Sequence, residues 1–481
     1  MVRTALSIVL LVIVAATGPA GAQPLLEPAE CSFFVPEGEQ ATCYVLHTAA
    51  DPIAPSLFLA ILHSTAATPE PDPVLWLNGG PGQPAFDDDA AESWWDETAG
   101  FRRLRDVIVY DARGAGRSRP SLDCDDIPAV PPAPGFAADP LQLEAQRLLA
   151  CRDRILAQGI DLSNYRLPDH AADAVRIVRA LGLNRVNLVG VSYGTRVAMQ
   201  VLRAAPELVR TAVLDGVYPP EVNGLVEAPA VRAGVFELLF DDCRIDWRCR
   251  AAFGDLAEHF DAMVERLVAG TASITRWSLE GAADMPLTPG DVIDAMIVMA
   301  GDPTLLPRLP LAIRHGGTGD MHEIAPFVAR AAGSGGLLSE GVALSTECSS
   351  DWAYADFTTY ARQVAAHVPY SSGHGVAIAW EVCPDWPVAA VPQDLREPVF
   401  SAVPVLMLTG SYDPVTPPAW AYAAARGFAN VQVIEVARAS HGLLGRFPCA
   451  TTAAAAFVEM PEIAAADVCR DRTRPPRFLT D

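Results

Sequence analysis

Short runs of apolar residues alternate with longer amphipathic stretches over the first half of the chain. Apolar runs of about four to eight residues are typical of buried strands, whereas apolar residues spaced three to four apart indicate helices. This alternation predicts a βαβ architecture with a mostly parallel sheet. The expected strands are 57–62, 74–77, 107–110, 186–191 and 212–214, and the expected helices between and after them are 141–158, 171–181 and 195–205.

The pattern changes after Asp215, and residues 218–403 read as mainly helical pieces joined by turns. Two of these pieces are 256–268 and 291–300. Strand-like runs then return at 405–408 and 431–436, with a helix expected at 419–426. The last two strands would lack a sheet unless they joined the first. We therefore expect one α/β core, residues 23–217 and 404–481, interrupted by a helical cap insertion at 218–403.

The first 22 residues have the features of a cleavable signal peptide. Arg3 provides a positive start, residues 5–16 are almost wholly apolar, and Ala20-Gly21-Ala22 offers the small-x-small cleavage pattern. The apolar run is short for a membrane span, and no second spanning segment follows. We expect a mature chain that begins at Gln23 and is secreted or periplasmic, without a membrane partner.

The cysteine count fits an exported protein. Ten cysteines in such a chain predict five disulfides, and the simplest hypothesis pairs neighbours along the sequence. None of them forms a paired C-x-x-C set, which argues against zinc. The cysteines are Cys31, Cys43, Cys124, Cys151, Cys243, Cys249, Cys348, Cys383, Cys449 and Cys469.

The charge of the chain excludes several classes of function. The net charge is −23, from 35 basic and 58 acidic residues, which disfavours nucleic acid as a partner. Every basic residue is arginine. The absence of lysine excludes a Schiff-base lysine, a Ser-Lys dyad and a Walker A lysine.

A candidate nucleophile follows the strand at 186–191. A serine flanked by glycines between a strand and a helix is typical of a nucleophile elbow, because the tight turn tolerates only small neighbours. Such a serine lies at a helix N-terminus, where free N–H groups favour developing negative charge. The motif is Gly190-Val191-Ser192-Tyr193-Gly194.

A glycine-rich loop follows the strand at 74–77. Its backbone amides can point at an oxyanion without interference from side chains. We expect the N–H groups of Gly80 and Tyr193 to form the oxyanion hole, Tyr193 being the residue after the nucleophile. The loop reads Asn78-Gly79-Gly80-Pro81-Gly82.

The chain order of the remaining polar residues selects an acid and a base. Asp413 follows the strand at 405–408 and His441 follows the strand at 431–436, which matches the order serine, acid, histidine. His374 precedes Asp413 and is the weaker candidate. The expected triad of Ser192, Asp413 and His441 performs acyl transfer without a metal or an organic cofactor.

Four motifs in this order resemble the tripeptidyl aminopeptidase and prolyl iminopeptidase group of α/β-hydrolases. The resemblance implies an α/β-hydrolase fold with a helical cap, short peptides as substrates, removal of residues from their N-termini, and the same triad. The motifs are the loop at 78–82, the serine motif extended to Arg196, Asp111-Ala112-Arg113-Gly114-Ala115-Gly116-Arg117-Ser118, and Asp413-Pro414-Val415-Thr416-Pro417-Pro418.

One cap motif differs from the group. The group often carries a Cys-x-Glu-Asp pattern, where the glutamate holds the substrate's amino group, but here Ser350 occupies the place of that glutamate. We expect the neighbouring carboxylates of Glu347 and Asp351 to bind the amine instead. Two other functions remain open, a secreted carboxylesterase and an inactive hydrolase-like binding protein. The sequence does not predict an oligomeric state.

Overall fold

The structure is a computed structural model. It describes residues 26–49, 51, 53–86, 88–130, 140–278, 281–332, 338–371, 374–437, 439–463, 469 and 477–480. The expected signal peptide, residues 1–22, lies outside the described residues.

A single nine-stranded sheet forms the centre of the fold, in the order β1-β2-β3-β5-β4-β6-β7-β10-β11. The six strands from β5 to β11 are parallel, and the other three extend the sheet as antiparallel neighbours. The predicted α/β fold with a mostly parallel sheet is therefore confirmed. The strands are β1 (Leu26–Ala29), β2 (Ala41–His47), β3 (Ser56–Leu62), β4 (Val74–Leu77), β5 (Val107–Tyr110), β6 (Val186–Val191), β7 (Val209–Asp215), β10 (Val405–Gly410) and β11 (Val431–Val436).

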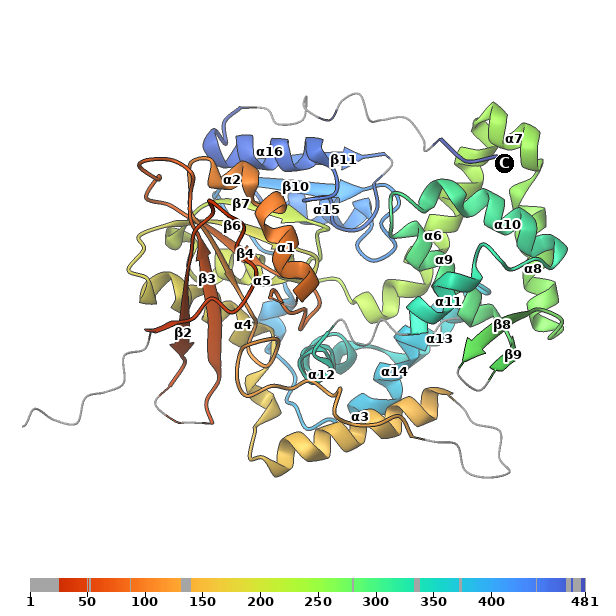
Figure 1. Ribbon diagram of the computed structural model, residues 1–481, viewed down its shortest axis with the longest axis horizontal. Helices are drawn as coiled ribbons and strands as arrows, with labels where there is room; N and C mark the ends of the chain where they lie inside the picture. The colour runs from red at the N-terminus through yellow and green to blue at the C-terminus, as the bar shows by residue number, and fades with distance from the viewer. Residues whose placement is uncertain are drawn as a thin grey trace, which may run out of the picture.

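Helices cover both faces of this sheet because successive strand residues point in opposite directions. In β4, Val74 and Trp76 pack with helices on one face, while Leu75 and Leu77 pack with helices on the other. A strand buried on both faces must be apolar throughout, as the continuous run in β4 is. The first face carries α1 (Asp88–Glu97), α2 (Ala99–Arg102) and α16 (Pro448–Glu459), and the second carries α4 (Leu167–Ala180), α5 (Tyr193–Ala204) and α15 (Pro418–Ala425) (Figure 1).

A largely helical segment separates β7 from β10 and lies beside the sheet (Figure 1). Its first helices have their own apolar core, and α12 and α14 pack against α3 (Pro140–Ala157). The helices of this segment are α6 (Gly224–Ile245), α7 (Trp247–Phe253), α8 (Leu256–Val268), α9 (Pro289–Ala300), α10 (Leu309–Thr318), α11 (Ala325–Ala332), α12 (Glu340–Ser349), α13 (Phe357–Ala366) and α14 (His374–Val382).

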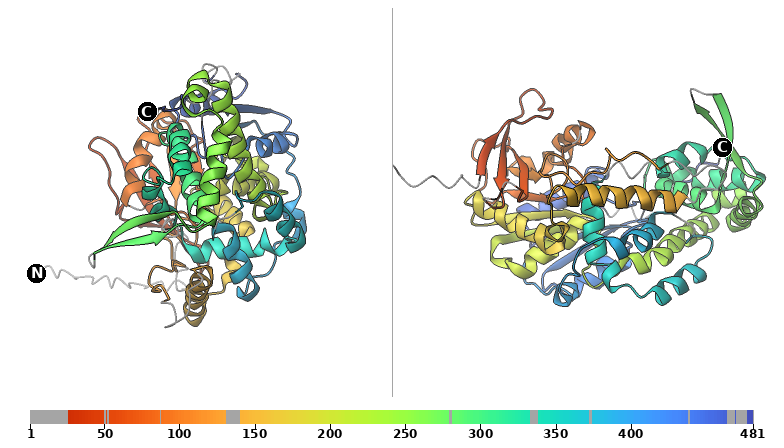
Figure 2. Two further views of the ribbon diagram at one scale, coloured as in Figure 1. Left: turned by 90° about the vertical axis from the view of Figure 1, so that its right-hand side faces the viewer. Right: turned by 90° about the horizontal axis from the view of Figure 1, so that it is seen from below.

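The segment also contains a β-hairpin that the apolar pattern does not predict. β8 (Ser273–Ser278) pairs antiparallel with β9 (Gly281–Pro286) as a separate two-stranded sheet. The hairpin, drawn in green, extends away from the helices in both views of Figure 2. Its strands lack the continuous apolar runs of the central sheet, which explains why the sequence pattern misses them.

Five disulfides join cysteines that are neighbours along the chain, the arrangement proposed above as the simplest. They are Cys31–Cys43, Cys124–Cys151, Cys243–Cys249, Cys348–Cys383 and Cys449–Cys469. Within the described ranges, none of the helices is long and apolar enough to cross a membrane.

Candidate active site

Ser192 occupies a sharp turn between β6 and α5. Its φ of 56° places it in the left-handed region, and it is the only non-glycine residue there among those described. Its backbone N–H donates to the carbonyl of Asp215 at the end of β7, at 2.8 Å. The side chain is 9% exposed. A strained backbone held by its neighbours in this way is typical of a functional turn.

The glycines on either side of Ser192 allow the turn to pack closely. A Cβ atom on Gly190 would lie 2.6 Å from the carbonyl oxygen of Gly194. A Cβ atom on Gly194 would collide with the carbonyl oxygen of Leu77, because the start of α5 lies directly against the end of β4. The G-x-S-x-G spacing is therefore required by close backbone contacts at two positions.

The glycine-rich loop after β4 lies against the serine. A Cβ atom on Gly79 would lie 3.2 Å from the Cβ of Ser192, and Gly80 has a φ of 107°, which favours glycine. No hydrogen bond from the N–H of Gly80 or Tyr193 is found within the described part of the chain. Free N–H groups beside the serine are what an oxyanion site requires.

His441 and Asp413 form a hydrogen-bonded pair. Nδ1 of His441 lies 2.8 Å from Oδ2 of Asp413. The Asp413 carboxylate is fully buried and also accepts the N–H groups of Val415 and Thr416 and the Thr416 hydroxyl. Four donors hold this carboxylate in one orientation, and the histidine ring follows it. Sequence reasoning missed Thr416, although it lies within the Asp413–Pro418 motif.

Two opposing effects act on the pKa of His441. Burial lowers the pKa, but the charge of Asp413 and its hydrogen bond raise it and prevail, so the pKa lies above the ordinary 6.5. The Ser192 hydroxyl makes no hydrogen bond to His441 or to any other described side chain of the structure. Catalytic hydrogen bonds of this kind often tighten only when substrate or the transition state is bound.

Comparison with known proteins places this arrangement in a family. Residues 72–244 match the family described as alpha/beta hydrolase fold, and residues 369–469 match the family described as TAP-like protein. The chain has the α/β-hydrolase fold. The resemblance to the aminopeptidase group is confirmed at the level of the TAP-like family, whose match includes Asp413 and His441.

Two proteins are similar in sequence to part of this chain. The tripeptidyl aminopeptidase of Streptomyces lividans is 32% identical over 177 residues, which cover 34% of this chain and 30% of that protein. The serine protease Hip1 of Mycobacterium tuberculosis (strain ATCC 25618 / H37Rv) is 25% identical over 341 residues, covering 65% of this chain and 64% of that protein. The chain thus matches less than two thirds of the length of either relative.

Asp215 is a buried carboxylate of this α/β-hydrolase that sequence reasoning did not assign. Its Oδ2 accepts the N–H groups of Leu443 and Leu444, at 2.7 and 2.8 Å, and so anchors the loop that begins with His441. Burial raises the pKa of Asp215 to about 6, against the lowering effect of the two N–H donors. Its position as the last residue of a buried strand was the signal available in the sequence.

Asp351 does not fit the expected role of binding a substrate amine. Its side chain is 7% exposed and is paired with the guanidinium groups of Arg196, at 3.1 Å, and Arg396, at 3.4 Å. The Tyr218 hydroxyl also donates to it. Two cations and a hydroxyl already neutralise this charge, so little remains to attract an ammonium group. Arg196 lies one turn after Ser192 in α5, so its ion pair with Asp351 links α5 to the end of α12.

Glu347 differs from Asp351 in having no such partner. No hydrogen bond or ion pair to its carboxylate is found within the described residues. Burial and the nearby negative charge of Asp351 raise the pKa of Glu347 to about 7. The preceding residue, Thr346, lies close to the Tyr193 side chain, so this part of α12 lies beside the nucleophile turn. An unpaired, partly buried carboxylate next to an active site is a candidate for binding a cation.

Proposed function

We propose that this chain is a serine hydrolase in which Ser192 is the nucleophile, His441 the base and Asp413 the residue that orients the base. The observation that carries the proposal is the His441–Asp413 hydrogen bond, together with a serine at a strained strand–helix turn. Nδ1–H of His441 donates to Asp413, which leaves Nε2 free to accept the serine proton.

The reaction follows from these roles. Ser192 Oγ attacks the carbonyl carbon while His441 Nε2 takes its proton, and the N–H groups of Gly80 and Tyr193 stabilise the oxyanion. The imidazolium, steadied by Asp413, then protonates the leaving group. Water then attacks the carbonyl carbon of the acyl-serine while His441 Nε2 takes a proton from it, and the imidazolium returns that proton to Ser192 Oγ as the bond from Oγ to the acyl group breaks. Each step uses side chains and backbone groups of this chain.

We further propose that the substrates are short peptides cleaved near their N-termini, with Glu347 binding the free amine. Burying an ammonium group without a partner is costly, so a site for a chain end needs an available carboxylate. Glu347 has no hydrogen-bond or ion-pair partner among the residues that the structure describes, whereas the charge of Asp351 is already neutralised. The similarity to a tripeptidyl aminopeptidase and to a serine protease supports a peptide substrate.

The experiment compares one short peptide p-nitroanilide with its N-acetylated form. The free-amine form should have a kcat/KM at least about 30-fold higher, since a broken buried charge pair costs roughly 2–5 kcal/mol. Glu347→Gln should remove most of that preference by lowering only the rate of the free-amine form. Glu381→Gln is a matched control. It removes a carboxylate of the same helical segment, but this carboxylate accepts a hydrogen bond from the Gln142 side chain and is not proposed to bind the amine.

Three outcomes would overturn parts of this proposal separately. Equal cleavage of both peptides would contradict aminopeptidase activity while leaving the serine mechanism intact. Preference for short acyl esters over both peptides would favour a carboxylesterase. Failure to cleave peptides or esters, with no reaction at Ser192, would favour an inactive binding protein.

We also propose that the protein is exported. Five disulfides in one chain are typical of oxidising compartments, and the first residues have the composition of a signal peptide. N-terminal sequencing of the protein from the exported fraction should begin at Gln23. Recovery of the chain only from the cytoplasm, with Met1 retained, would contradict export.

A further inference from the structure

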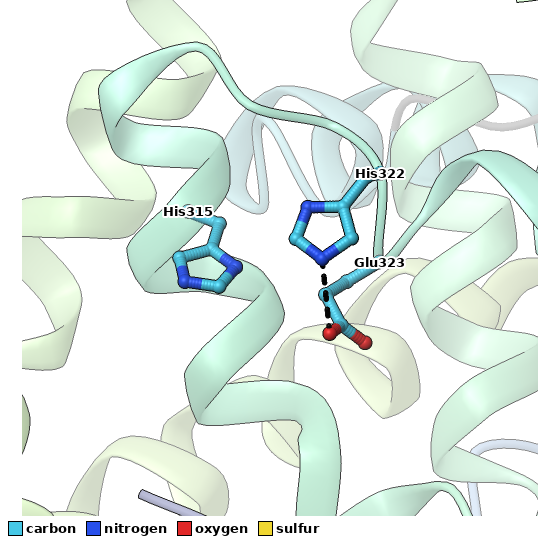
Figure 3. Close-up of side chains that lie close together, drawn as sticks. All are labelled: His315, His322 and Glu323. Carbon is cyan, nitrogen blue, oxygen red and sulfur yellow. Dashed lines mark ion pairs between the residues drawn. The ribbon is translucent and has the colours of Figure 1, made fainter. Parts of the chain in front are cut away.

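Two histidines and a glutamate lie together in the helical segment, on elements that carry none of the proposed triad (Figure 3). His315 lies in the last turn of α10, and His322 and Glu323 lie in the turn before α11. Each residue offers one ligand atom, and these atoms all lie within 4.8 Å of one another. Imidazole nitrogen and carboxylate oxygen are both ligands of zinc-type ions.

The backbone turn after α10 brings these residues together. Gly319 adopts the left-handed conformation that ends the helix, with a φ of 93°. The N–H of Asp320 then donates back to the carbonyl of His315 at 3.0 Å. The chain reverses direction here, so that His322 comes to lie beside His315, with ring centroids 5.1 Å apart.

The separation of two of the ligand atoms already suits a metal ion. Nε2 of His322 lies 3.2 Å from Oε1 of Glu323, the pair joined by the dashed line in Figure 3. In a tetrahedral site with bonds of about 2.0–2.1 Å, two ligand atoms are about 3.4 Å apart. A ring nitrogen of His315 faces this pair (Figure 3). Because the three ligand atoms lie within 4.8 Å of one another, the His315 nitrogen would have to approach the pair by no more than about 1.4 Å.

Side chains next to His322 and Glu323 hold these two residues in orientations that suit metal binding. Oδ1 of Asp320 lies 2.9 Å from Nδ1 of His322, so this nitrogen can carry the proton and leave Nε2 free for a metal. Arg308 donates to both carboxylate oxygens of Glu323, Oε2 at 3.1 Å and Oε1 at 3.3 Å, and holds the carboxylate in place. Carboxylate–histidine pairs of this kind commonly support a bound metal.

A second observation comes from His315 itself. Its Nδ1 atom is buried and has no hydrogen-bond partner among the described residues. Buried polar atoms are normally satisfied, and an exception needs an explanation. A bound metal ion would supply the missing partner. The lack of a paired C-x-x-C set disfavours a zinc site built on cysteines, and this cluster contains no cysteine.

We propose that His315, His322 and Glu323 bind a zinc-type divalent metal ion, with a water molecule as the fourth ligand. The ion would join the end of α10 to the start of α11. This proposal concerns the helical segment alone and does not depend on the serine chemistry.

The test is calorimetric titration of the untagged, chelator-treated full-length mature protein with ZnCl2 at about pH 8, because protons compete with the metal ion for its ligands. The wild type should bind about one equivalent, and zinc should raise its thermal unfolding midpoint. His322→Ala and Glu323→Gln should each weaken binding at least about 100-fold and remove the thermal shift. Asp320→Asn, which alters only the orienting carboxylate, should weaken binding about 10- to 100-fold.

His367→Ala is the matched control, because His367 lies in the same segment but bonds the carbonyl of Gln363 instead. This variant should bind zinc as the wild type does. Circular dichroism of each metal-free variant establishes that the fold is intact. The absence of binding by the wild type, or unchanged binding in both His322→Ala and Glu323→Gln, would reduce the cluster to ion pairs and overturn the proposal.

Discussion

Nδ1 of His441 lies 2.8 Å from Oδ2 of Asp413, an oxygen that also accepts the Thr416 hydroxyl at 2.7 Å. This hydrogen bond selects the histidine tautomer that can accept a proton at Nε2. Asp413→Asn can present an amide N–H to Nδ1, which would favour the wrong tautomer. We expect kcat to fall on the order of 10⁴-fold while circular dichroism stays unchanged.

Asp356→Asn is a suitable control for that substitution. Asp356 caps α13 by accepting N–H groups of Thr358 and Thr359, a role that asparagine also fills. The activity of the Asp356→Asn variant should equal that of the wild type. If Asp413→Asn kept more than about a tenth of the activity, another acid would have to orient His441.

The acid limb of the pH profile should report His441. The base works only when neutral, and Asp413 raises the pKa of His441 above 6.5. With an uncharged ester substrate, kcat/KM should therefore fall as the pH drops through that raised pKa, with a slope of about one. A rate that stays constant down to about pH 5 would contradict a histidine base.

A free-amine peptide should give a steeper acid limb than the ester. Glu347 must be ionised to bind the ammonium group, and burial raises its pKa to about 7. Two groups then titrate over the same range. Glu347→Gln should restore a slope of about one with the peptide and leave the ester profile unchanged. Identical profiles for peptide and ester in the wild type would exclude Glu347 from amine binding.

Gly194 packs closely against the backbone of Leu77 at the nucleophile turn. We therefore expect two glycine-to-alanine substitutions to differ strongly in their effect on stability. Gly194→Ala places a methyl group against the carbonyl of Leu77 and should cost at least about 2 kcal/mol of unfolding free energy. Gly234 lies within α6, and a Cβ atom added there would have no heavy atom within 4 Å. Gly234→Ala should therefore be neutral or should stabilise the fold by up to about 1 kcal/mol. Urea unfolding of both variants measures the difference, and equal stabilities would refute the close packing.

Asp215 should contribute to activity through the His441 loop. Asp215→Ala leaves the buried N–H groups of Leu443 and Leu444 without an acceptor, at a cost of about 2–4 kcal/mol. Its kcat should fall because the loop that carries His441 loses its anchor. Asp215→Asn keeps an oxygen acceptor and should retain most of the stability and the activity. A similar loss in both variants would show that the charge, and not the two hydrogen bonds, is what matters.

The central sheet could be predicted because its strands are buried on both faces. The run Val-Leu-Trp-Leu of β4 has no polar residue, and such a run has few alternatives to a buried strand. β2 was missed because it lies nearer the sheet edge, where only some of its residues are buried. The β8–β9 hairpin was missed for a related reason, since it belongs to a separate two-stranded sheet.

The triad candidates could be chosen because each follows a predictable strand in a known order. The charged neighbours of the candidate substrate-binding residues could not be predicted from the sequence in the same way. Asp351 meets Arg196 and Arg396, which lie 155 and 45 residues away in the sequence, and only the folded chain brings them together. This pairing distinguishes Asp351 from Glu347, although the sequence presents both as acidic residues beside Cys348.

The most direct test of the proposed mechanism is the mass of the intact protein after treatment with a fluorophosphonate. We expect one adduct per chain, located at Ser192 by peptide mapping, with loss of activity in proportion to labelling. Ser192→Ala should remain unlabelled and inactive, with an unchanged circular dichroism spectrum. Labelling at another serine, or an unlabelled Ser192→Ala variant that still turns over substrate, would contradict the assignment of Ser192 as the nucleophile.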